Sequence, residues 1–189
     1  TAGGAVWLDP RKTSPYSFYQ FWLNAADADV ETYLKLFTFL GQAEVAGLQQ
    51  EMASAPEKRS AQIRLAQEVT RIVHGQASLD SAERITQAIF GGELAALTLD
   101  DFEQLMLDGL PSSAARPGDG LLSVIAQAGL AKSVGEARKL VQGGGVRMNG
   151  EVIIDHQQVL DFTAGFFGRY LVLRRGKKLH HLLVNGENS

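Results

Sequence analysis

The sequence has no cysteine among its 189 residues, and this absence excludes several classes of site. Disulfide frameworks, thiolate zinc sites and cysteine nucleophiles all need the residue that is lacking. The lack of cysteine is also typical of a reducing compartment, so a cytoplasmic location is expected. No apolar run approaches the ~20 residues of a membrane helix, and no signal peptide opens the chain, so we expect no membrane partner.

Catalytic motifs are lacking as well. The sequence contains no Walker-type phosphate loop, no His-Glu-x-x-His and no Gly-x-Ser-x-Gly. Glycines 143–145 have no third glycine at the Rossmann spacing and are expected to end a helix. Adjacent His180 and His181 would point to opposite faces of a strand, so no metal site is expected there. The residues indicate a protein that binds a partner rather than transforming one.

The net charge of −3 hides an uneven distribution. Residues 1–117 hold nine basic and fifteen acidic residues, a net charge of −6, whereas residues 118–189 hold nine and six, a net charge of +3. Such asymmetry indicates a nucleic-acid or membrane partner. The densest basic stretch has no acidic residue and comprises Arg169, Arg174, Arg175, Lys177, Lys178, His180 and His181. Its apolar residues favour a strand that holds these charges on a fixed surface, and a merely solvated strand-and-turn surface is the alternative.

The first part of the chain is predicted to be an all-α domain over residues 1–107. Ser14-Pro15 is a helix start, Asp29 is expected to cap a second helix, and Thr98 with Asp101 forms a capping box. A long helix is predicted from Pro56 to His74, with apolar residues toward the core at Ile63, Ala66, Val69, Ile72 and Val73.

Two features of this part leave alternatives open. The aromatic residues of 16–22 could form a base-stacking platform, but their helical spacing favours a hydrophobic core. Asp27 and Asp29 could bind a metal or accept hydrogen bonds from a base edge. Helix capping explains Asp29 and leaves Asp27 less well explained.

The chain is α+β overall, because a different pattern follows the first domain. Residues 108–120 are rich in glycine, proline and serine and are predicted to be a linker. Residues 121–189 are predicted to form a small α+β domain of two helices and a small antiparallel sheet, with a hairpin turn at Asn149-Gly150. Its second helix and first strand carry basic residues that could grip a phosphate backbone: Lys132, Arg138, Lys139 and Arg147.

Several segments resemble the part of bacterial tyrosyl-tRNA synthetases that follows the catalytic core. These segments are residues 2–10, 13–22, 26–30, 36–40 and 68–75, and Phe167-Gly168-Arg169 with residues 173–178 resembles the end of that family's chain. The basic helix with residues 146–150 is similar to the RNA-binding fold shared with ribosomal protein S-four. Thr1 resembles the last residue of the family's mobile lysine loop.

The resemblance implies a helical anticodon-binding domain followed by a ribosomal-protein-S-four-like RNA-binding domain, with tRNA(Tyr) as the partner. It implies ATP and magnesium as cofactors of the whole ligase and no cofactor in this part. Tyrosine activation would then lie upstream, and these residues alone would be inactive. The whole enzyme would be a homodimer through its catalytic domain, and this part a monomer. The RNA-binding residues that we expect are Lys132, Arg138, Lys139, Arg147, Arg169, Arg174, Arg175, Lys177, Lys178 and, for an anticodon base, Asp27.

Two other interpretations stay open at this point. The chain could be a non-catalytic RNA-binding or protein-interaction module unrelated to aminoacylation, or an enzyme in its own right. Competition between tRNA(Tyr) and an unrelated tRNA distinguishes the first, and tyrosine-dependent exchange of pyrophosphate into ATP distinguishes the second.

Overall fold

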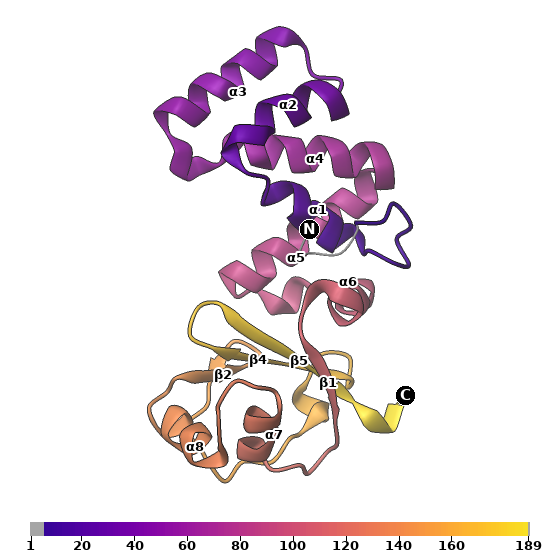
Figure 1. Cartoon of the computed structure of the whole chain (residues 1–189). Helices are drawn as coiled ribbons and strands as arrows, with labels where there is room; N and C mark the ends of the chain where they lie inside the picture. The colour runs from indigo at the N-terminus through magenta and orange to yellow at the C-terminus, as the bar shows by residue number, and fades with distance from the viewer. Residues whose placement is uncertain (1–5, 189) are drawn as a thin grey trace. The chain divides into compact units, whose positions relative to one another are not determined.

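The computed structural model describes residues 6–188 (Figure 1). These residues form two compact units, which divide between Ile85 and Thr86. Each unit has its own core. Thr1, the residue expected to end the lysine loop, lies outside the described residues, as do residues 2–5 of the first resembling segment. The division into units does not test the predicted domain bounds at 107 and 121, which stay a prediction.

The first unit is all α-helical in its described residues, as predicted. It contains α1 (Pro15–Leu23), α2 (Asp27–Phe37), α3 (Gln42–Ser54), a 3₁₀ turn (Pro56–Lys58), α4 (Ser60–His74) and the start of α5 (Gln76–Gly91), which continues into the second unit. Helix α1 packs along α4, and the shared core contains Phe18, Leu34 and Leu65. Amphipathic helices of this length are stabilised mainly by burying one face in this way.

The helix starts in this unit confirm one expected cap, contradict another and shorten one predicted helix. Ser14 caps α1 as expected, with its hydroxyl accepting the N–H of Ser17 at 3.0 Å. Asp29 does not cap α2, because the helix already begins at Asp27 after Ala26. The long helix predicted from Pro56 is broken at Arg59, whose φ of 53° is incompatible with a continuous α-helix.

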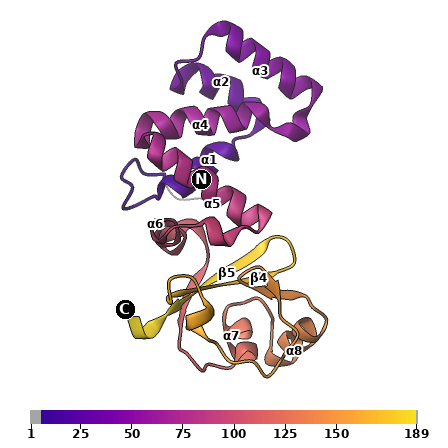
Figure 2. The same ribbon diagram turned by 180° about the vertical axis from the view of Figure 1, so that it is seen from behind.

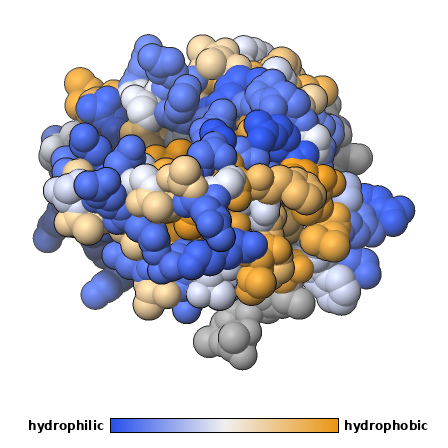
Figure 3. Space-filling model, turned by 90° about the horizontal axis from the view of Figure 1, so that it is seen from above, coloured by the Kyte–Doolittle hydropathy of each residue, from blue (hydrophilic) through white to orange (hydrophobic). Residues whose placement is uncertain are grey.

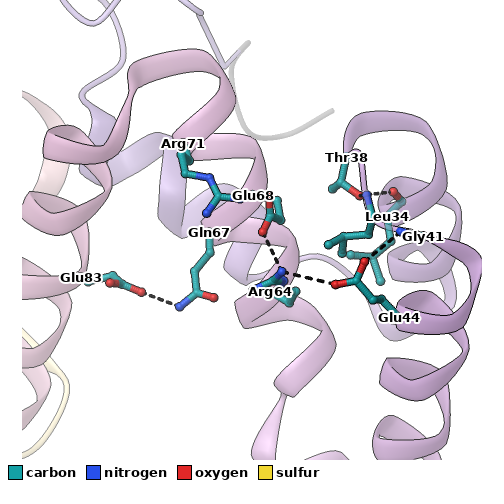
Figure 4. Close-up of polar contacts among 10 residues, drawn as sticks. Leu34, Thr38, Gly41, Glu44, Arg64, Gln67, Glu68, Arg71 and Glu83 are labelled. Atoms are coloured by element: carbon teal, nitrogen blue, oxygen red, sulfur yellow. Dashed lines mark hydrogen bonds and ion pairs between the residues drawn. The ribbon is translucent and has the colours of Figure 1, made fainter.

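A polar network joins α4 to its neighbours (Figure 4). The Glu68 carboxylate is nearly buried and pairs with the guanidinium groups of Arg64, at 3.1 Å, and Arg71. Arg64 also reaches Glu44 of α3 at 3.7 Å. The amide of Gln67 donates to Glu83 of α5 at 2.6 Å. These contacts fix the helices beside α4, because a buried carboxylate is stable only when it is paired.

The second unit is α+β and is built of helices around one sheet. After the end of α5 come a 3₁₀ turn (Leu94–Ala96), α6 (Leu99–Gln104) and a π-helical turn (Leu105–Gly109). Strand β1 (Ser112–Ala115), α7 (Leu121–Gln127) and α8 (Val134–Gln142) follow. The sheet is completed by β2 (Val146–Met148), β3 (Glu151–Val152), β4 (Tyr170–Arg175) and β5 (Leu179–Asn185). The expected capping box is present at Thr98 and Asp101, and the Ser133 hydroxyl accepts the N–H of Glu136 at the start of α8.

The sheet has the order β1-β5-β4-β2-β3 and is mixed rather than purely antiparallel. Strand β1 pairs parallel with β5, so Ser112 lies opposite Leu182. The prediction of an entirely antiparallel sheet was therefore wrong at this edge. Residues 112–115 lie inside a segment whose proline and glycine content indicates a loop, so no strand was predicted there. They nevertheless pair with β5 at four positions. The hairpin at Asn149-Gly150 is confirmed, with positive φ at both residues.

The two faces of this sheet have different coverings. Leu171, Leu173 and Leu183 point into a core with α7 and α8. Tyr170 points to the opposite face, where its ring stacks on Phe102 of α6 at 4.9 Å and an interplanar angle of 8°. Figures 1 and 2 show α7 and α8 below the sheet and α6 above it. Successive side chains of β4 therefore point alternately toward α7 and α8 and toward the face that carries α6.

Candidate nucleic-acid interface

The basic residues of α8 are exposed. Lys132 precedes the helix, and Arg138 and Lys139 lie on it. Among residues 6–188, the side chains of Arg138 and Lys139 make no ion pair within 4.0 Å and no hydrogen bond. Exposed cations without partners are free to neutralise the charge of a polyanion.

Strand β4 divides its basic residues between the two sheet faces. Arg174 lies opposite Arg147 of β2 and His180 of β5, so three nitrogen-bearing side chains form a row across the sheet. Arg147 donates to the carbonyl oxygen of Gly150 at 2.8 Å. Arg174 is half-buried against Ile89 and Leu94, and its Nε has no partner among the described residues. This row faces the segment that includes residues 88–94 rather than open solvent.

Arg175 lies on the other face, against α8. It donates to the carbonyl oxygen of Leu130 at 2.7 Å and pairs with Glu136 at 3.3 Å. The basic residues of this strand are thus divided between two faces of the sheet, because consecutive residues of a strand point to opposite faces. Arg175 is placed to hold α8 on the sheet.

Lys177 and Lys178 are both exposed in the turn that joins β4 to β5. The N–H of Gly176, at the start of this turn, approaches the carbonyl oxygen of Gly145 at 3.5 Å. Gly145 follows the end of α8, so the lysine turn and the basic helix lie at the same end of the second unit, as Figures 1 and 2 both show. We call the exposed set at this end, Lys132, Arg138, Lys139, Lys177 and Lys178, the basic end.

Arg169 begins the approach to β4 and is half-buried. Its guanidinium carbon lies 5.4 Å from the centre of the Tyr170 ring, and its Nε has no partner among the described residues. An arginine held on an aromatic ring keeps its charge beside an apolar surface.

Asp27, the residue expected to read an anticodon base, has a partner within the first unit. Its carboxylate accepts a hydrogen bond at 2.5 Å from the amide of Gln62, a buried residue of α4. Whether Asp27 binds RNA stays a prediction.

An open pocket of about 320 Å³ lies beside the α1–α2 connection. Its aromatic walls include Phe21 and Tyr33, and its polar lining includes Gln20, Asn24 and Asp29. The Asp29 side chain makes no hydrogen bond or ion pair with the described residues. This pocket was not predicted from the sequence, because Asp29 was expected to cap a helix rather than to line a binding site.

The aromatic stretch 16–22 divides between core and surface. Tyr16, Phe18 and Tyr19 are buried, as the helical spacing favours, whereas Phe21 is 51% exposed. Other exposed apolar side chains of the first unit include Leu36 and Phe39. Figure 3 looks down on the molecule from above Figure 1 and shows a mostly hydrophilic surface with apolar residues gathered at one side.

The histidines form no metal site within residues 6–188, where no cluster of three or more His, Cys, Asp and Glu residues could hold an ion. Burial lowers the pKa of both His180 and His181. The Nε2 atom of His181 lies 2.9 Å from the hydroxyl of Ser113 on β1, whereas His180 belongs to the row with Arg174. The expectation that these neighbours face opposite ways is confirmed.

None of the helices within residues 6–188 has both the length and the hydropathy needed to span a membrane.

Two family models match successive parts of the chain. The model described as tRNA synthetases class I (W and Y) matches residues 1–91. The model described as the tyrosine–tRNA ligase SYY-like C-terminal domain matches residues 101–183. Both models fall in the order that the sequence resemblance implies.

Known proteins are similar along nearly all of the chain. The tyrosine–tRNA ligase of Limosilactobacillus fermentum is 50% identical over 184 residues, which is 96% of this chain and 44% of the relative. That of Klebsiella pneumoniae subsp. pneumoniae is 48% identical over 183 residues, which is 97% of this chain and 43% of the relative. A solved C-terminally truncated mitochondrial tyrosyl-tRNA synthetase from Aspergillus nidulans is 37% identical with a TM-score of 0.44, covering 46% of this chain and 25% of its own. The chain spans less than half the length of the curated relatives that it matches. With both family models and both curated relatives in agreement, the chain belongs to the tyrosine–tRNA ligase family.

Proposed function

We propose that the chain binds tRNA(Tyr) for a tyrosine–tRNA ligase. The observation that carries this proposal is the basic end, where one exposed cation just before α8, two on α8 and two in the β4–β5 turn lie at the same end of the second unit. The similar proteins are tyrosine–tRNA ligases, and this points to tRNA(Tyr) as the RNA. Within the family, such a surface suits a role in holding tRNA while another part of the enzyme performs the chemistry.

The basic end would act on the phosphate backbone. Each lysine or arginine that neutralises a phosphate releases a condensed counterion, which favours binding and makes it sensitive to salt. Contacts of this kind position an RNA without reading its sequence. Arg175 would support the same surface indirectly by keeping α8 against the sheet.

The pocket beside the α1–α2 connection would hold an unpaired base. Phe21 and Tyr33 offer rings for stacking, and Asp29 offers a carboxylate that can accept hydrogen bonds from a base edge. Because Asp27 is bonded to Gln62, we propose Asp29 rather than Asp27 as the acidic residue that reads the base.

We further propose that these 189 residues do not activate tyrosine on their own, and that the ATP and magnesium of the ligase reaction bind elsewhere in the enzyme. No phosphate-binding glycine motif is present in the sequence, and the chain spans under half of its relatives. We propose a monomer for this part, a homodimer for the whole ligase, and a cytoplasmic location, consistent with the absence of cysteine.

The test measures binding of a tRNA(Tyr) transcript to the 189-residue chain over a series of salt concentrations. We expect log K to fall by ~0.7–0.9 for each phosphate contact per log unit of salt. An unrelated tRNA of the same length serves as the competitor. Binding that ignores salt contradicts the role of the basic end, and equal affinity for both tRNAs contradicts recognition of tRNA(Tyr). The same preparation should show no tyrosine-dependent exchange of pyrophosphate into ATP, and such exchange would contradict the assignment of catalysis elsewhere.

A further inference from the structure

A tight turn in the second unit holds an exposed phenylalanine in a backbone conformation that side chains rarely adopt. Phe167 has a φ of 57°, and Gly168 after it has a φ of 65°. The N–H of Arg169 donates to the carbonyl oxygen of Phe166 at 3.0 Å, and Phe166 pairs antiparallel with Tyr170. Positive φ at both central positions is the signature of a type I′ turn.

The same chain builds this kind of turn elsewhere with a better suited residue. At the β2–β3 hairpin, Asn149 and Gly150 have φ values of 53° and 92°. The amide oxygen of Asn149 also accepts the N–H of Val172 at 2.9 Å, so its side chain stabilises the fold. Asparagine enters the left-handed region readily, whereas a bulky side chain there is an outlier. The turn at Phe167 therefore carries an aromatic residue where asparagine would be less strained.

Burial offers little compensation for this strain. Phe167 remains 57% exposed, and its ring contact in the described chain is an edge contact with Phe102 at 6.0 Å. Its neighbour Phe166 instead stacks on Phe102 at 5.0 Å, and Tyr170 is fully buried. The Phe166 and Tyr170 rings thus complete the core while the Phe167 ring is left largely to solvent.

The surroundings of the ring favour a nucleic-acid base as its partner. Arg169 is two residues away, and its guanidinium is held over the Tyr170 ring. Lys177 and Lys178 lie beyond the six residues of β4, at the other end of that strand. An aromatic face beside a cation is the arrangement that stacks an unpaired base while attracting a neighbouring phosphate.

We propose that Phe167 stacks on an unpaired base of the bound RNA and that Arg169 contacts an adjoining phosphate. The strained turn presents the ring outward for this purpose, in line with the tendency of strained residues to mark functional sites. This inference deepens the proposed function and rests on it.

The test compares Phe167→Asn with Phe167→Tyr in the full 189-residue chain. Asparagine suits the turn and removes the ring, whereas tyrosine keeps the ring. The probes are a tRNA(Tyr) transcript and RNA stem–loops that carry 2-aminopurine at single loop positions. We expect Phe167→Asn to fold with at least the stability of the unmodified chain, to bind the transcript roughly 5- to 150-fold more weakly, and to lose the quenching of one 2-aminopurine position. Phe167→Tyr should retain both properties.

The salt dependence separates this inference from the proposed function. Losing a stacking contact lowers affinity at every salt concentration and leaves the slope of log K against log salt unchanged, because no phosphate contact is lost. Phe39→Ala, which removes a ring that is 91% exposed in the first unit, is the matched control and should bind normally.

Three results would overturn the inference. The first is an unchanged affinity for the transcript in Phe167→Asn. The second is a lower stability in Phe167→Asn than in Phe167→Tyr, with the same RNA binding in both variants. The third is the absence of 2-aminopurine quenching at every loop position with the unmodified chain. If the unmodified chain binds no RNA, the proposed function itself fails. Normal binding with an unaffected Phe167→Asn variant removes only the stacking role.

Discussion

Arg174 and Arg175 are neighbours in the chain but lie on opposite faces of strand β4. Arg175 is bonded to Leu130 and Glu136 on the helix side, whereas Arg174 lies beside Arg147 and His180 on the other side. These two arginines are equivalent in the sequence of the basic run, but their different contacts give them different roles in the fold. Substitutions at these positions should separate stability from RNA binding.

Replacing Arg175 with methionine should reduce the stability of the second unit. The change removes a hydrogen bond to the Leu130 carbonyl and a partly exposed ion pair, so we expect a loss of about 1 kcal/mol. Urea denaturation followed by circular dichroism gives the free energy of unfolding. Arg138→Met is the matched control on the same helix and should change that free energy by less than about 0.5 kcal/mol. Equal losses in the two variants would contradict the bracing role of Arg175.

Replacing Lys177 and Lys178 together with alanine should weaken tRNA binding through its electrostatic part. If each lysine neutralises one phosphate, the slope of log K against log salt should become shallower by about 1.4–1.8. Thermal unfolding should be unchanged, because both side chains are exposed. Lys58→Ala, at an exposed position of the first unit, supplies the control. An unaltered salt slope in the double variant would remove the turn from the interface.

Substitution of Asp27 should mainly reduce stability, whereas substitution of Asp29 should mainly affect RNA recognition. Asp27→Ala leaves the buried Gln62 amide without its acceptor, so the first unit should lose about 1–3 kcal/mol of stability. Asp29→Ala should cost about 0.3–1 kcal/mol through the helix dipole, and should reduce the preference for tRNA(Tyr) over a transcript with a changed anticodon. Denaturation of both variants measures the change in stability, and binding of both transcripts measures the change in preference. A normal preference in Asp29→Ala would exclude the proposed reading role.

The first unit should lose stability as the pH falls through about 6.5. Burial lowers the pKa of His74, whose ring lies 4.7 Å from that of Phe18 and whose Nε2 has no partner among the described residues. The unfolded chain, with an ordinary histidine pKa of about 6.5, binds the proton more readily than the folded unit. The His74 contribution is therefore complete above that pH and is lost below it.

His74→Phe keeps the aromatic contact and removes the titrating group. Both tryptophans, Trp7 and Trp22, belong to the first unit, so their fluorescence follows its unfolding in denaturant. We expect the fall in stability between about pH 7 and pH 5 to be smaller in this variant. An identical pH dependence in both proteins would assign the effect to other groups.

The sequence was sufficient for features that depend on local chemistry. Ser14 before Pro15 and Asn149 before Gly150 were assigned correctly, because a cap or a turn is decided by a few neighbouring residues. The two-part organisation was likewise predictable from the change in hydrophobic periodicity. The family resemblance, rather than any local pattern, suggested the partner that we propose.

Features that depend on distant partners could not be predicted in the same way. Ile63, Ile72 and Val73 were expected in the core but are 37–45% exposed, because α4 instead buries Ala61, Leu65 and Ala66 against its neighbours. Strand β1 was missed because its pairing partner lies some seventy residues later. The division of basic residues between faces, and the pocket containing Asp29, follow from the exact register and helix start.

The strand order has a consequence for folding of the chain during translation. Strand β5 ends at Asn185, yet it lies between β1 and β4 and hydrogen-bonds to both. All the helices of the first unit have been synthesised roughly a hundred residues earlier, so that unit can fold while translation continues. The sheet cannot close until its latest strand has emerged. A chain halted before Leu179 would carry β1 and β4 with unpaired edges, and such edges invite aggregation.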